Sequence, residues 1–182
     1  MQGEMAAEWM DVIEGLLFVS SKPLNLQRLK EILEPLTMSE IREHLQRLQS
    51  HYQERKGALQ MKEIAGGYQI FTRPELAPWI RKMVEERPAK LSRAALESLA
   101  IIAYNQPTSK SQVDSIRGVD SQKSLKTLLE KGLVKVLGRK EEAGRPLLYG
   151  TTKRFLERFG LKDLSSLPSQ KELEEMGLRE EV

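Results

Sequence analysis

Residues 91–150 read LSRAALESLAIIAYNQPTSKSQVDSIRGVDSQKSLKTLLEKGLVKVLGRKEEAGRPLLYG, and this stretch decides the fold. Ser92, Ser109 and Asp120 each precede a run of residues with helical periodicity, where N-capping residues are expected. Two strand-like runs, LVKVLG and PLLYG, then flank a charged loop that contains a glycine. Three helices followed by a hairpin predict a winged helix-turn-helix.

The first half of the chain shows the same order of elements. Apolar spacing predicts a first helix around Trp9, a second after Asn25 and a third after Thr37. The strand-like runs ALQMKEIA and YQIFTRP flank Gly66-Gly67, which is a two-residue hairpin signal. A last helix is expected from Pro74 to about Glu86.

We therefore predict an α+β, mostly helical chain of two tandem winged helix-turn-helix domains. The expected boundaries are 1–87 for the N-terminal domain, 88–165 for the C-terminal domain and 166–182 for a loosely ordered acidic tail. A shift of 84 residues aligns Pro23 with Pro107, which supports the repeat. The alternative is one irregular helical domain whose halves are similar by chance.

The composition is typical of a soluble globular protein of the cytoplasm. Apolar residues make up 40% of the chain and charged residues 30%. The absence of cysteine excludes disulfides and thiolate chemistry. No apolar run approaches the ~20 residues that a membrane span requires, so we expect no membrane contact.

Positive charge is concentrated in the second domain. Residues 1–90 carry 13 basic and 13 acidic side chains, residues 91–165 carry 14 and 8, and residues 166–182 carry 2 and 5. Candidate weak nucleic-acid contacts on the third helix and wing are Lys123, Lys126, Arg139 and Lys140. Acidic residues lie in the same wing, and the helix has no Arg or Asn for bidentate base contacts, so sequence-specific binding is not predicted.

The search for catalytic or metal-binding motifs is negative. His44 and His51 are seven residues apart, which is too wide for the i, i+4 pair of a helical zinc site. Gly66-Gly67 lacks the context of a phosphate-binding loop. We therefore expect no enzyme activity, no metal and no cofactor.

The helix SRAALESLAIIAY is apolar on more than one face. We assign to its core face Ala95, Leu96, Leu99, Ala100, Ile102 and Ala103. Such a helix is usually buried on two sides, either by the other domain or by an amphipathic helix of a partner. Under the second interpretation, the candidate partner-binding residues are Ala94, Ile101 and Tyr104.

Four segments resemble the segregation and condensation protein B family: LESLAIIAYNQP, SIRGVDS, LLEKGLVKVLGRKEEAGRPLLYGTT and FLERFGLKDLSSLP. The run GRPLLYGTT at residues 144–152 is the most specific part. The resemblance implies an accessory subunit of the bacterial SMC chromosome-condensing complex, at the nucleoid. It implies homodimerisation mainly through the first domain and binding of the kleisin subunit (segregation and condensation protein A) largely through the second. The SMC ATPase would be contacted through the kleisin, and DNA contact would be weak or indirect.

The chain also offers candidate residues for its interfaces. Trp9 and Trp79 are candidate dimerisation residues, because their domain is too small to bury much surface alone. Gly144, Arg145 and Pro146 form a candidate wing motif, with Arg145 expected to pair with Glu141 or Glu142. The favoured function is a non-enzymatic scaffold in chromosome condensation and segregation. The alternative is a winged-helix DNA-binding transcriptional regulator.

Overall fold

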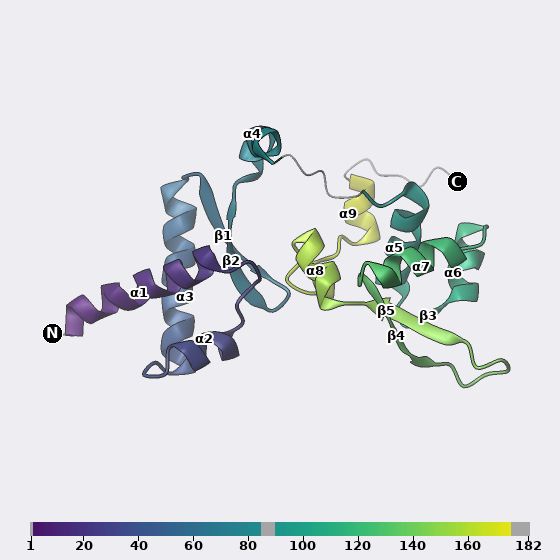
Figure 1. Cartoon of the computed structure of the whole chain (residues 1–182), viewed down its shortest axis with the longest axis horizontal. Coiled ribbons are helices and arrows are strands. Elements are labelled where there is room, and N and C mark those ends of the chain that lie inside the picture. The colour runs from purple at the N-terminus through teal and green to yellow at the C-terminus, as the bar shows by residue number, and fades with distance from the viewer. Residues whose placement is uncertain (1, 85–89, 176–182) are drawn as a thin grey trace. The chain divides into compact units, whose positions relative to one another are not determined.

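The computed structural model describes residues 2–84 and 90–175 (Figure 1). Two compact units make up the chain: Met1–Arg87 with Leu161–Ser166, and Pro88–Gly160 with Leu167–Val182. In each unit, three helices precede a β-hairpin, which confirms the tandem winged-helix fold.

The first unit is built from a three-helix seam and a two-stranded sheet. Its elements are α1 (Gln2–Val19), α2 (Leu26–Ile32), α3 (Met38–Arg55), β1 (Leu59–Ile64), β2 (Gly67–Thr72), η1 (Pro74–Leu76), α4 (Ala77–Met83) and η2 (Leu164–Ser166). The helices predicted after Asn25 and Thr37 begin there: Asn25 accepts a hydrogen bond from the Arg28 amide, and Thr37 forms a capping box with Glu40. The core is formed by Ile13, Leu17, Leu29, Leu33, Leu36, Ile41, Leu45, Leu48, Tyr52 and Met61.

The hairpin turn lies one residue earlier than predicted. Ala65 and Gly66 have φ values of +52° and +71°, as the two central residues of a type I′ turn do, and Gly67 pairs with Ile64. Gly67 has a different role: a Cβ there would lie 2.9 Å from the backbone carbonyl of Leu24. The backbone of Leu24 pairs with Tyr68, so a glycine lets this segment lie beside the hairpin.

The end of the first unit also differs from prediction. The last helix is short: η1 and α4 end at Met83, Val84 is extended, and Glu85 and Glu86 lie outside the described residues. Residues 161–166, most of which we assigned to the second domain, group with the first unit. The Ala65 amide donates to the Leu161 carbonyl at 2.9 Å, and Lys162 forms an ion pair with Glu63 at 3.0 Å.

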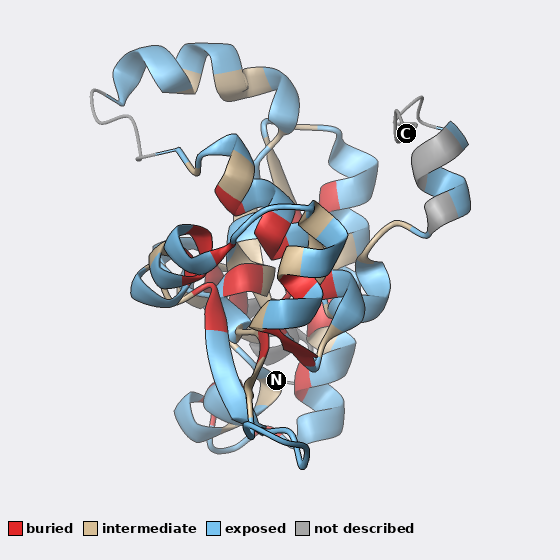
Figure 2. Ribbon diagram, turned by 90° about the vertical axis from the view of Figure 1, so that its right-hand side faces the viewer, coloured by how far each residue is buried: buried red, intermediate tan, exposed pale blue. Residues whose placement is uncertain are grey.

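The second unit repeats the plan with a third short strand. Its elements are α5 (Arg93–Asn105), β3 (Thr108–Ser109), α6 (Lys110–Arg117), α7 (Gln122–Glu130), β4 (Val134–Arg139), β5 (Leu147–Thr151), α8 (Lys153–Phe159) and α9 (Gln170–Glu175). The sheet order is β3-β5-β4, all antiparallel, with a bulge in β4 between Val136 and Gly138. Buried residues lie on the inward faces of the helices, and exposed residues cover the outward faces (Figure 2).

The tail is more ordered than we expected over part of its length. Ser169 and Glu172 exchange capping hydrogen bonds at the start of α9. Residues 176–182 of the expected tail lie outside the described residues. Within the part of the chain that the structure describes, no helix is both long and apolar enough to span a bilayer.

Gly67→Ala should destabilise the first unit, because the new methyl group would press on the Leu24 backbone. Overpacking of this kind costs about 1–3 kcal/mol of unfolding free energy. The matched control is Gly57→Ala, whose Cβ would meet only the Arg55 side chain at 3.9 Å. Urea denaturation of both variants tests the idea. Equal stability of the two would contradict a close approach at Gly67.

Candidate partner-binding surfaces

Helix α5 presents an exposed apolar stripe that differs from the predicted face. Its buried residues are Ala95, Ser98, Leu99, Ile102 and Ala103. Leu96 is 45% exposed and Ala100 is exposed, so our assignment of these two to the core was wrong. Ser98 lies in the core instead, because its hydroxyl donates to the Ala94 carbonyl at 2.9 Å and is satisfied there.

The three candidate partner-binding residues have different environments. Tyr104 is 49% exposed and continues the line of Leu96 and Ala100 at four-residue spacing. Ala94 and Ile101 are half-buried on the other flank of the helix. We call Leu96, Ala100 and Tyr104 the α5 stripe. Its Tyr104 end is held by a hydrogen bond from the Tyr104 hydroxyl to the Pro168 carbonyl at 2.7 Å.

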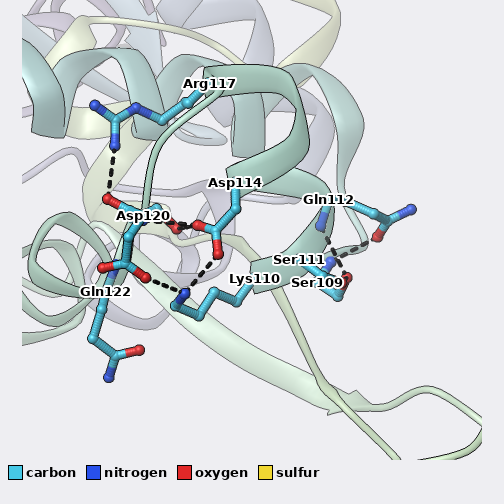
Figure 3. A network of polar contacts seen from close by, with 9 residues as sticks. Ser109, Lys110, Ser111, Gln112, Asp114, Arg117, Asp120 and Gln122 are labelled. Carbon is cyan, nitrogen blue, oxygen red and sulfur yellow. Dashed lines mark hydrogen bonds and ion pairs between the residues drawn. The ribbon is translucent and has the colours of Figure 1, made fainter.

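A network of charged and polar side chains fixes the turn between α6 and α7 (Figure 3). Lys110 forms ion pairs with Asp114 at 2.6 Å and Asp120 at 2.5 Å. Asp114 also accepts hydrogen bonds from the Ser121 amide at 2.7 Å and the Ser121 hydroxyl at 2.5 Å. Asp120 accepts from the Gln122 amide, whereas Ser121 occupies the N-cap position that we predicted for Asp120.

The same network determines the charge state of Asp114. Hydrogen bonds from Lys110 and then Ser121 lower the pKa of the Asp114 carboxyl from 3.8 to about 2. The pKa of Lys110 is raised by its hydrogen bonds to Asp114 and Asp120. Both groups are therefore charged at neutral pH, and the turn is held by charge-assisted hydrogen bonds.

An ion-pair chain joins α6 to the outer side of α5. Arg117 donates to Glu97 at 3.2 Å, and its side chain is only 7% exposed. Glu97 also pairs with Arg93 at 3.1 Å. Glu97 therefore bridges two arginines beside the α5 stripe, and these three side chains keep one net positive charge.

The wing motif adopts a tight turn in which Arg145 does not pair as we expected. Gly144 and Arg145 have φ values of +83° and +40°, and the Arg145 amide donates to the Glu142 carbonyl at 2.8 Å. The residue that pairs with Glu142 is Lys140, at 2.5 Å. Pro146 directly precedes β5, where its missing N–H removes no ladder bond, and its carbonyl accepts from the Lys140 amide.

Contacts within the unit also engage three of the four candidate nucleic-acid residues. Lys140 pairs with Glu142, and Arg139 donates to the Arg145 carbonyl at 3.0 Å. Lys126 lies 3.9 Å from Glu130, one turn along α7. Lys123 is exposed on the same helix. The four residues thus present less uncompensated charge than the sequence suggested.

The two candidate dimerisation residues differ in how far they are buried. Trp9 is half-buried and packs against the core of the first unit, so much of its surface is used internally. Trp79 on α4 is 66% exposed.

The fold makes this chain a tandem winged-helix protein. Apolar surface lies outside the core of each of its two units. The sequence profile of the family described as "Segregation and condensation complex subunit ScpB" matches residues 11–170. The chain therefore belongs to this family.

Individual relatives agree with the profile. Segregation and condensation protein B of Syntrophotalea carbinolica is 46% identical over 165 residues, which cover 91% of this chain and 83% of the relative. The protein of Desulforamulus reducens is 47% identical over 160 residues, with 88% of each chain covered. Crystal structures of ScpB from Mycobacterium tuberculosis and of a dimer of the ScpB N-terminal domain complexed with ScpA peptide are 32% and 25% identical. They cover 86% and 44% of this chain and 97% and 99% of theirs, with TM-scores of 0.41 and 0.40. Family membership rests on the sequence matches.

Asp114→Asn should destabilise the second unit in a pH-dependent way. Because the folded pKa of about 2 lies below the ordinary 3.8, the carboxylate stabilises the fold fully above about pH 4. That contribution is lost as the pH falls through about 2. Allowing for partial solvent screening, we expect a loss of about 1–2 kcal/mol at pH 7.

Urea denaturation across a pH series measures this effect. The difference between the parent and the Asp114→Asn variant should shrink between pH 4 and pH 2. The exposed Glu54→Gln serves as the control for removing a carboxylate. A difference that does not change with pH would contradict the proposed role of the charge.

Proposed function

We propose that the chain is a non-enzymatic scaffold subunit of an SMC–kleisin complex and acts in chromosome condensation and segregation at the nucleoid, in the cytoplasm. The observation that carries the proposal is the family match over residues 11–170, since the family is described as a complex subunit. Apolar surface outside the core of each unit supports it, because such patches mark protein–protein contacts.

The kleisin would bind the second unit on the α5 stripe. Leu96, Ala100 and Tyr104 lie at four-residue spacing, so they share one face of α5. The apolar face of an amphipathic partner helix could pack on this face. At the rim of the stripe, Glu97 pairs with both Arg93 and Arg117, which lowers the cost of covering these charges with an apolar partner. Ala94 and Ile101 lie half-buried on the other flank of α5 and would not be at the centre of this contact.

Homodimerisation would involve the first unit; residues 1–90 are neutral in sum. Its exposed apolar side chains support this proposal, Trp79 among them. DNA contact would be weak: Lys123 could meet phosphate, but Lys126 lies near Glu130 and Lys140 pairs with Glu142. The SMC ATPase would be reached through the kleisin, with no cofactor on this chain.

Assembly from purified components tests the function. We expect the full chain to form a complex with its cognate kleisin in size-exclusion chromatography with light scattering. Two copies of this chain should be present in that complex. The SMC ATPase should join only when the kleisin is present. Sequence-specific DNA binding that survives about 200 mM salt, without kleisin binding, would favour the transcriptional regulator instead.

Leu96→Asp should weaken kleisin binding without unfolding the chain. Burying an aliphatic side chain at an interface is worth roughly 1.5–3 kcal/mol, so we expect at least a tenfold loss of affinity by calorimetry. Because Leu96 is 45% exposed, the melting temperature should hardly change. Ile101→Asp, on a half-buried residue, should lower both affinity and stability.

The matched control is Ile116→Asp, a change of an exposed aliphatic residue on α6 of the same unit. It should bind the kleisin as the parent does. Normal binding by a folded Leu96→Asp variant would show that the kleisin uses another surface.

A further inference from the structure

The C-terminal segment of the second unit meets the α5 stripe at one end. The Tyr104 hydroxyl donates to the Pro168 carbonyl at 2.7 Å, and the two residues are 64 positions apart in the chain. Leu167 and Pro168 are both half-buried, so this part of the segment packs on the unit. We call residues 167–175 the C-terminal strap. The strap therefore starts from a fixed point beside the aromatic residue of the stripe.

Most of the stripe stays open beside this contact. Leu96 is 45% exposed, Ala100 is exposed, and Tyr104 keeps 49% of its surface exposed. The Pro168 contact thus occupies one end of the stripe and leaves the apolar residues beyond it uncovered. A partner that covers the whole stripe has to meet the strap at the Tyr104 end.

Directly after Pro168 the strap forms a short, preformed helix. The Ser169 amide donates to the Glu172 carboxylate at 2.7 Å, and the Glu172 amide donates to the Ser169 hydroxyl at 3.3 Å. Lys171 lies 3.9 Å from Glu175, one turn further along α9. The capped helix is thus tethered at the end of an apolar stripe on the same unit.

Charge and length suit the strap to this surface. Residues 166–182 carry two basic and five acidic side chains, whereas residues 91–165 carry 14 and 8. Beside the stripe, Arg93, Glu97 and Arg117 keep one net positive charge. The six residues of α9 extend about 9 Å, against about 12 Å from one end of the stripe to the other. A strap tethered at Pro168 can therefore reach the middle of the stripe.

We propose that the C-terminal strap is an autoinhibitory element, which competes with the kleisin for the α5 stripe. The inference rests on the proposed binding of the kleisin to this stripe and adds its regulation. A partner helix that covers Tyr104 has to break the Tyr104–Pro168 hydrogen bond and displace the strap from that end. Only the fraction of the chain with a displaced strap can bind, so the apparent affinity is lower than that of the bare stripe.

Tyr104→Phe tests the competition, because it removes the anchoring hydroxyl and keeps the apolar ring. Calorimetry of the full chain with its cognate kleisin should show binding about two- to tenfold tighter than that of the parent, which is the effect of losing one hydrogen bond from the closed form. The matched control is Tyr149→Phe, the same change on β5 of the same unit. It should leave the affinity unchanged.

A spin label on the strap reports its displacement directly. The parent chain has no cysteine, and the Lys171 side chain is 86% exposed, so a nitroxide on Lys171→Cys disturbs little. Its spectrum should show faster motion when the kleisin is added, and also in the free chain when Tyr104→Phe is combined with it. A label on Lys123→Cys, which is exposed on α7, should not respond to Tyr104→Phe.

The outcomes separate this inference from the proposed function. A parent chain that does not bind the kleisin, or whose binding is unaffected by Leu96→Asp, would overturn the proposed site and the strap together. If Leu96→Asp weakens binding, two results would overturn the strap alone. One is unchanged affinity of Tyr104→Phe with no change in label motion. The other is weaker binding by Tyr104→Phe with a label slowed by the kleisin, which would make the strap part of the binding site.

Discussion

Each unit is held together by packing one face of its first helix on its third. In the first unit Ile13 and Leu17 of α1 lie against the Ile41, Leu45 and Leu48 seam of α3. In the second, α5 makes the corresponding contact with α7. A unit of this size needs only one face of each helix to close its core. Both α1 and α5 have apolar residues on more than one side. The apolar residues that do not face the core are therefore exposed. This excess of apolar surface supports the proposed binding of partners.

Part of the positive charge of the second unit serves its internal geometry. Lys110 forms ion pairs with Asp114 and Asp120. Arg117 pairs with Glu97, and Lys140 pairs with Glu142. Each pair fixes the position of a turn or of the wing. In the sequence, these cations contribute to the positive charge of the second domain, for which nucleic-acid binding was considered. Net charge gives the excess of cations over anions in a domain, but the positions of the ion pairs decide which cations a ligand meets.

The fold could be predicted because it depends on short-range signals. Capping at Asn25, Thr37, Ser92 and Ser109 and the apolar periodicities between them set the helices. What could not be predicted depends on tertiary contact. The turn at Ala65-Gly66 was misplaced because Gly67, the more obvious turn residue, is needed beside Leu24. The core face of α5 was ambiguous because apolar residues lie all round it, and a satisfied Ser98 replaced Leu96 inside.

The α5 stripe has distinct ends, which bears on how the proposed partner helix would dock there. The stripe runs from Leu96 through Ala100 to Tyr104, and the Pro168 carbonyl holds the Tyr104 hydroxyl at one end. A surface whose two ends differ favours one direction of a helix bound to it. The proposed kleisin segment would therefore lie on α5 in a single orientation.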